Sequence, residues 1–143
     1  MDEDLVARIT RLEDIEAIKQ LKAEYCDICD DLHNPDRISS LFVENGIWES
    51  PAFGKATGHT ELRALFEKFR GMFSFSQHNI MNPRITVDGG TATGIWYIMG
   101  PWDSTEDEKR IWMTARYDDD YVKVNGEWKY SHLRVDVRMA EDR

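Results

Sequence analysis

Apolar residues in the first part of the chain recur every three or four positions. Between Ile9 and Leu32 this spacing is kept by Leu12, Ile15, Ile18, Tyr25 and Ile28. Such a pattern is typical of a helix with one apolar face, and it predicts a long first helix. Asn34 followed by Pro35 is typical of a helix start, so PDRISSLF is predicted to form a short second helix. The helical spacing returns in TELRALFEKFRGMF and predicts a third helix.

From Ser74 onward the pattern changes to a period near two, which is typical of β-strands. Four runs follow one another, SQHNIMNPRITVD, GGTATGIWYIMGPW, EKRIWMTARYDDDYVKV and GEWKYSHLRVDVRM, and their DGG and NG turns favour an antiparallel meander. GIWES predicts a further short strand before the third helix. Helices followed by strands predict an α+β fold, in which a curved sheet wraps around the helices and leaves an internal pocket. A length of 143 residues fits one domain, residues 1–143.

The composition restricts the kinds of partner. The 27 acidic and 18 basic residues give a net charge of -9, and the bases are scattered, which argues against nucleic acid. No apolar run approaches the ~20 residues that span a bilayer, and the acidic start MDEDL is unlike a signal peptide. We therefore expect a cytoplasmic protein that binds no membrane. Five Trp, five Tyr and six Phe favour an aromatic-lined pocket, although core packing also accounts for them. The run DDD at 118–120 is predicted to be a solvated turn.

The stretch EYCDICDDLHNPD combines cysteines, acids and a histidine. A redox role is not expected, because Cys26 and Cys29 fall near the C-terminal end of the first helix, where neighbouring acids raise a thiol pKa. A zinc site from Cys26, Asp30 and His33 is an alternative, since these residues share a helical face. We predict no metal, because the usual second ligand pair is missing from the sequence, and treat the thiols as small buried apolar groups. His33 and His59 are expected to be exposed to solvent.

Asp30 differs from the other acids of this stretch, because it projects from the same side of the helix as the small residues Ala23 and Cys26. A carboxylate in that position can face a cavity without filling it, and if buried it needs a donor. The best donor is His78, at the start of the first long strand. A carboxylate that holds one imidazole nitrogen leaves the other free as a general base. The alternative for His78 is a core histidine bound to the backbone.

Four segments together resemble one family: LEDIEAIKQLKAEYCDICDD, DRISSLFVENGIWESPAFGKATGHTELRALF, FSQHNIMNPRITVDGGTATGIWYI and RYDDDYVKVNGEWKYSHLRVD. They look like the SnoaL-like branch of the NTF2-like superfamily, whose lyases include scytalone dehydratase and hexachlorocyclohexane dehydrochlorinase. The resemblance implies a cone of three helices inside a strongly curved mixed or antiparallel sheet. It also implies that Asp30 and His78 are catalytic. Cys29 stands where a tyrosine precedes the aspartate in scytalone dehydratase, which is a departure from that pattern.

Further residues are candidates for substrate binding: Tyr25, Trp48, Met81, Trp96, Arg116 and Arg134. The aromatic residues and the methionine would form an adaptable apolar wall. The two arginines would bind a substrate oxygen or stabilise developing negative charge. The alternatives are ordinary core packing for the aromatic residues, and a surface strand or a subunit contact for the arginines.

These inferences lead to one functional hypothesis, a lyase without a cofactor that acts on a small, apolar, aromatic molecule. His78 would remove a proton, and water, halide or a small carbonyl fragment such as formaldehyde would leave. The same cone also houses isomerases, cyclases, small subunits of ring hydroxylases and binding proteins without a reaction, and these remain the alternatives. Because a curved sheet leaves an apolar outer face, a homodimer or homotrimer is expected.

Overall fold

The computed structural model describes residues 2–143; Met1, the first residue of the predicted 1–143 domain, lies outside the described residues. The helical elements are α1 (Glu3–Asp30), α2 (Pro35–Ile38), the 3₁₀ turn η1 (Ser39–Leu41) and α3 (His59–Met72). The three predicted helices are therefore confirmed, although α1 begins six residues earlier than its apolar pattern. It does so because the Asp2 carboxylate accepts the Asp4 N–H and acids follow in the first turn, where they interact favourably with the helix dipole.

The strands form one seven-stranded sheet. They are β1 (Phe42–Ser50), β2 (Gly54–Thr57), β3 (Phe73–Ser76), β4 (Asn79–Asp88), β5 (Thr91–Ser104), β6 (Arg110–Val124) and β7 (Glu127–Asp142). The predicted antiparallel meander is confirmed in β4 to β7. The order across the sheet is β2-β1-β7-β6-β5-β3, with β4 also on β5, and β1 runs parallel to β7. The sheet is therefore mixed, one of the two arrangements that the resemblance implied.

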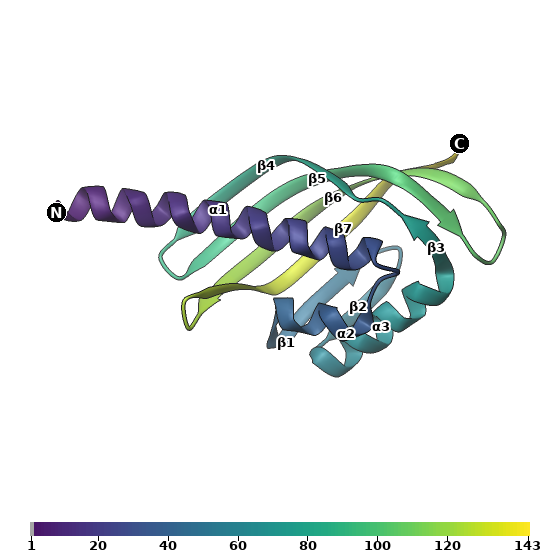
Figure 1. Cartoon of the computed structure of the whole chain (residues 1–143), viewed down its shortest axis with the longest axis horizontal. Helices are drawn as coiled ribbons and strands as arrows, with labels where there is room; N and C mark the ends of the chain where they lie inside the picture. The colour runs from purple at the N-terminus through teal and green to yellow at the C-terminus, as the bar shows by residue number, and fades with distance from the viewer. Residues whose placement is uncertain (1) are drawn as a thin grey trace.

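The sheet curls around α1, which lies along its concave side, while α2 and α3 lie together at one end (Figure 1). Residues 2–13 of the chain are exposed, and the buried residues of α1 begin at Asp14. The N-terminal part of α1 extends beyond the sheet (Figure 1). The result is an α+β cone whose interior is filled by side chains from the second half of α1 and from the concave face of the sheet. No helix within residues 2–143 is long and apolar enough to cross a membrane.

The closed part of the cone holds a buried ion pair. Lys22 of α1 donates to Asp119 of β6 over 2.8 Å, and both side chains have no exposed surface. The Tyr121 hydroxyl also donates to Asp119, and the Lys22 ammonium lies 3.4 Å from the centroid of the Tyr117 ring. The prediction of a solvated turn at 118–120 is therefore wrong, because this run lies inside β6 and alternation turns its middle residue into the cone.

A break between β3 and β4 sets the position of residues 77 and 78. The Gln77 N–H donates to the Pro101 carbonyl over 3.1 Å. Gly100 permits this close approach, since a Cβ at that position would lie 1.8 Å from the Gln77 carbonyl oxygen. His78 is consequently held at a discontinuity in the edge of the sheet, opposite the end of α1.

Candidate functional site

A narrow pocket opens between the C-terminal end of α1, α3 and the concave face of the sheet. It contains about 490 Å³ of space outside the atoms, part of which is open to solvent. Seven of its fifteen lining residues are aromatic: Tyr25, Trp48, Phe53, Phe69, Phe73, Trp102 and Tyr117. The wall also includes Cys29, His33 and His78. Apolar walls with a few converging polar groups are typical of sites for small molecules.

Asp30 and His78 are in direct contact at this pocket. Asp30 is the last residue of α1, and its Oδ1 lies 2.6 Å from Nδ1 of His78. The His78 backbone N–H donates to both carboxylate oxygens, over 3.1 and 2.9 Å, and the Ser76 hydroxyl donates over 3.2 Å. A carboxylate can only accept, so Nδ1 carries the proton. Nε2 on the opposite side of the ring has no hydrogen-bond partner among residues 2–143.

His33 is buried in the same pocket, which corrects the expectation that it is exposed. Only 6 % of its surface is accessible, and its ring lies among Phe66, Phe69 and Phe73 with centroid separations of 5.4–5.8 Å. The His78 ring lies 6.1 Å away. Burial, reinforced by His78, lowers the pKa of His33 to about 3, so its imidazole is neutral at physiological pH.

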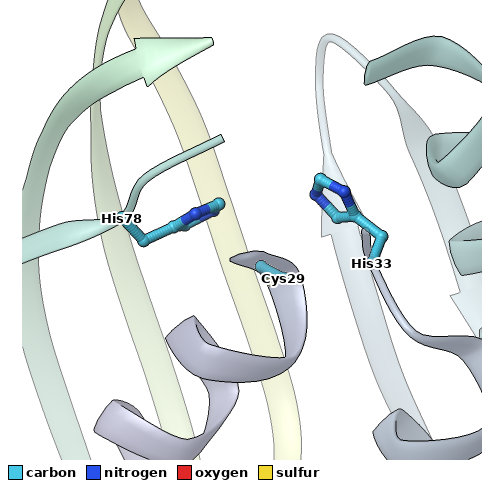
Figure 2. A group of neighbouring side chains, drawn as sticks. All are labelled: Cys29, His33 and His78. Atoms are coloured by element: carbon cyan, nitrogen blue, oxygen red, sulfur yellow. The ribbon is translucent and has the colours of Figure 1, made fainter. Parts of the chain in front are cut away.

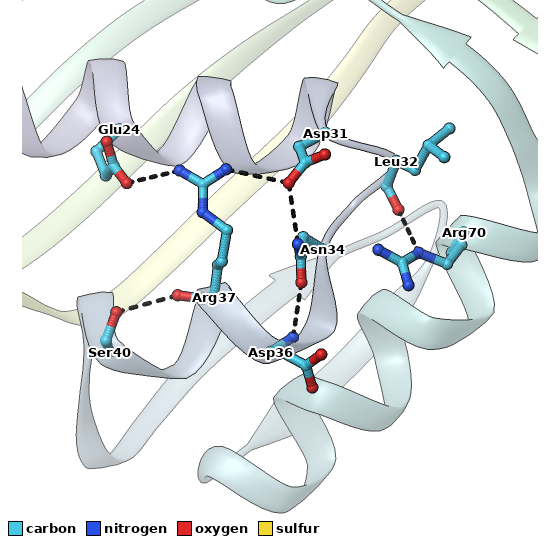
Figure 3. Close-up of polar contacts among 8 residues, drawn as sticks. All are labelled: Glu24, Asp31, Leu32, Asn34, Asp36, Arg37, Ser40 and Arg70. Atoms are coloured by element: carbon cyan, nitrogen blue, oxygen red, sulfur yellow. Dashed lines mark hydrogen bonds and ion pairs between the residues drawn. The ribbon is translucent and has the colours of Figure 1, made fainter.

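The burial of His33 follows from the backbone of the corner between α1 and α2. Leu32 and His33 both have a positive φ, 51° and 49°, which reverses the chain at once after the helix. Polar contacts hold this corner: Arg37 pairs with Asp31 over 3.1 Å, and Arg70 of α3 donates to the Leu32 carbonyl over 3.0 Å (Figure 3). The apolar pattern missed the reversal, and the pair Asn34-Pro35 was the signal for it.

Tyr25 and Trp48, two of the candidates for substrate binding, both line the pocket. The Trp48 indole donates to the Tyr25 hydroxyl over 2.8 Å. Burial, with Cys29 and Tyr117 nearby, holds the pKa of Tyr25 well above its usual value. Tyr25 therefore stays protonated and keeps a hydroxyl proton at the pocket wall.

The structure does not bring the other four predicted binding residues to this pocket. Trp96 points inward but lies deeper in the cone, where its indole donates to Tyr121 over 3.0 Å. Met81 of β4 is 38 % exposed. Arg116 and Arg134 line a separate hollow beside β1 and β2. None of these four residues therefore lines the pocket that contains His78. For the two arginines, the geometry of the strands explains why.

Alternation along the strands puts both arginines on the outer face of the sheet. Ala115 and Tyr117 line the pocket, so Arg116 between them faces away, where it pairs with Asp118 over 3.1 Å. In β7 the pairing with β6 skips Ser131, because Tyr121 pairs with Tyr130 and Asp120 pairs with His132. This bulge exchanges the two faces of β7, so Arg134 faces outward and the next residue, Val135, lines the pocket.

The set Cys26, Asp30 and His33, weighed from the sequence as the alternative to no metal, is not the cluster that the structure brings together, and Asp30 contacts His78. Instead, donor atoms of Cys29, His33 and His78 lie within 4.8 Å of one another (Figure 2). Burial raises the pKa of Cys26 to about 12 and holds that of Cys29 well above its usual value. Both cysteines are buried free thiols, as predicted.

Comparison with known proteins identifies the family. The sequence model of the SnoaL-like domain matches residues 10–134, and the chain belongs to this family. Similar solved structures include that of LinA, with a TM-score of 0.89, 21 % identity, and coverage of 95 % of this chain and 93 % of LinA. A hexachlorocyclohexane dehydrochlorinase (LinA-type3) from Novosphingobium barchaimii matches with a TM-score of 0.87, 20 % identity, and coverage of 95 % and 94 %.

A third similar structure is a scytalone dehydratase-like protein from Novosphingobium aromaticivorans. Its TM-score is 0.84, its identity to this chain is 26 %, and the match covers 95 % of this chain and 91 % of that protein. These likenesses confirm the fold, a cone in which helices lie within a strongly curled mixed sheet.

Proposed function

We propose that this protein is a lyase that needs no cofactor and uses His78 as a general base oriented by Asp30. The observation that carries the proposal is the 2.6 Å contact between Nδ1 of His78 and Oδ1 of Asp30, beside an apolar pocket. Asp30 is itself held by the His78 backbone and by Ser76, so the imidazole has one tautomer and a fixed direction.

The reaction would start when Nε2 of His78 takes a proton from the substrate. In an elimination, the C–H electron pair forms a double bond, and chloride or hydroxide leaves the adjacent carbon with its bonding pair. In a retro-aldol cleavage, His78 takes the proton from a hydroxyl, the O–H electron pair forms the C=O bond of formaldehyde, and the C–C bond breaks with its pair left on the other carbon. The imidazolium then returns the proton to this carbanion. In both reactions the imidazolium is stabilised by Asp30. Tyr25 lines the same pocket, and its hydroxyl would face a developing oxyanion.

The lining of the pocket supports a small aromatic substrate. Its rings come from β1, α3 and β5 as well as from α1, so they surround a bound ring on several sides. The names of two similar structures, hexachlorocyclohexane dehydrochlorinase and scytalone dehydratase, describe enzymes that eliminate halide and water, which favours elimination as the reaction type.

The test is a screen of the wild type with β-chloro and β-hydroxy aryl ketones and with aryl-propanediols, read by mass spectrometry and by formaldehyde release. We expect turnover with at least one class, a loss of about 10²–10⁴-fold in His78→Gln, and a loss near 10⁴-fold in Asp30→Asn. Asp27→Asn is the matched control, because Asp27 is an exposed acid one turn earlier in α1. Activity of Asp30→Asn within about tenfold of the wild type would refute the orienting role.

The same screen separates a lyase from a binding protein without a reaction. Ligand binding is followed by NMR with the same compounds, in the wild type and in His78→Gln. Binding that survives in His78→Gln, combined with no turnover by the wild type, would replace the lyase proposal with the binding protein.

We also propose that the protein forms a homodimer or homotrimer through the outer face of the sheet. Met99, Trp112 and Met139 are 40–46 % exposed there, and Met99 and Met139 flank Thr114 in the same row. Such an apolar row on neighbouring strands favours association. Sedimentation velocity should show an oligomer for the wild type and a shift toward monomer for Trp112→Glu; equal profiles would contradict the proposal.

A further inference from the structure

Three side chains that bind soft and borderline metal ions converge on the wall of the pocket. Cys29 comes from the last turn of α1, His33 from the corner before α2, and His78 from the break between β3 and β4. One donor atom from each lies within 4.8 Å of the others. Figure 2 shows the side chains of His33 and His78 pointing toward each other from opposite sides, with Cys29 between them in this view.

His33 presents its ring to the same pocket. The residue is 6 % exposed, and its ring nitrogens are not among the enclosed polar atoms of residues 2–143 that lack a partner. Because no other residue of this part of the chain hydrogen-bonds to the ring, its nitrogens are open to a ligand in the pocket. The reversal of the chain at Leu32 and His33 places this ring opposite His78.

The contact between Asp30 and His78 has the arrangement found behind metal-bound histidines. In such sites the ring nitrogen that does not bind the metal donates to a carboxylate, which fixes the tautomer and makes the ligand more basic. Asp30 holds Nδ1 of His78 in this way, and Nε2 is the nitrogen left for an ion.

We propose that Cys29, His33 and His78 bind one zinc ion, which occupies Nε2 of the proposed base and thereby inhibits the enzyme. One thiolate and two imidazoles suit zinc, whereas magnesium and calcium prefer oxygen ligands. Zinc bonds of about 2.0–2.3 Å place ligand atoms about 3.5 Å apart, so the three donors must close by about 1 Å. The binding claim rests on the donor geometry alone, and only the inhibition rests on the proposed function.

The test uses the full chain, freed of metal by dialysis against a chelator and titrated with cobalt(II) and then with zinc. We expect one cobalt per chain, with a thiolate-to-cobalt absorption band that zinc displaces. Cys29→Ser should lose the band, and Cys29→Ala provides a second variant if the first is unstable. His33→Phe, which keeps an aromatic ring in that position, should weaken zinc binding at least tenfold in competition with a chromophoric chelator.

Cys26→Ser is the matched control, because Cys26 is also a buried free thiol of α1 but lies outside the donor cluster. It should bind cobalt and zinc as the wild type does. A band that survives in Cys29→Ser or disappears in Cys26→Ser would overturn the proposal, as would zinc binding unchanged in His33→Phe. These optical readouts do not depend on turnover, so the zinc site and the lyase activity fail or succeed separately. Where turnover is found, zinc should abolish it and a chelator should restore it.

Discussion

Replacing Lys22 with methionine tests the electrostatics of the closed end of the cone. Methionine has a similar length and fills the same space, but it leaves Asp119 as a buried acid without its counter-ion. Lys22 and Asp119 are 2.8 Å apart, and neither side chain is exposed. Removal of one partner of such a pair costs about 3–5 kcal/mol, because the remaining charge is uncompensated. That is a large share of the ~5–15 kcal/mol by which domains are stable.

A second variant separates the pair interaction from the loss of the lysine itself. In Lys22→Met/Asp119→Asn the uncompensated charge is gone. The Tyr121 hydroxyl, which donates a hydrogen bond to Asp119 in the wild type, can donate to the amide oxygen of the new asparagine instead. We expect the double variant to recover at least half of the lost stability, with a coupling of about 2 kcal/mol or more.

The assay is urea unfolding followed by the fluorescence of the five tryptophans. Lys19→Met is the control, since Lys19 is exposed on the same helix, and it should stay within about 0.5 kcal/mol of the wild type. A loss below about 1 kcal/mol in Lys22→Met would refute this account of the pair. The account would also be refuted if the stability lost in the double variant equals the sum of the losses in Lys22→Met and in Asp119→Asn.

Three further predictions concern the backbone, a thiol and an imidazole. Gly100→Ala should lower stability by about 1–3 kcal/mol in thermal unfolding, because the new Cβ would meet the Gln77 carbonyl. Gly71→Ala in α3 has open space around the new methyl group and should raise stability by about 0.5–1 kcal/mol. Burial raises the Cys26 pKa to about 12, so iodoacetamide at pH 8 should alkylate it in the native protein at least about a hundredfold more slowly than in the unfolded chain; equal rates would contradict this. By NMR, His33 should remain neutral from pH 8 down to pH 5, since its pKa is lowered to about 3, and a midpoint near 6.5 would show that the ring is solvated.

The sequence was most informative where one periodicity extends over many residues. The helical spacing of α1 and the alternation of β4 to β7 gave the right elements, because each buries one face against the other. The start of α1 was missed because its first turns are exposed, so no apolar pattern marks them and only the cap at Asp2 does. The α+β order then followed from the sequence of elements.

The site was predictable only in part. Asp30 and His78 were paired on residue chemistry, and the structure places them in contact. The inward position of His33 depends on two successive positive φ angles, which no periodicity encodes. The outward position of Arg134 depends on the bulge at Ser131, where one extra residue exchanges the two faces of a strand.

The parallel pairing of β1 with β7 also affects how the protein is made. Phe42 pairs with Tyr130, so during synthesis β1 leaves the ribosome long before its larger partner exists. Until then, its only neighbour in the sheet is the short β2. Contacts so distant along the chain slow folding, because a long loop must close before any of them forms. The pocket wall formed by β1 is therefore completed late, and a nascent chain halted before β7 would expose this strand to chaperones and to neighbouring chains.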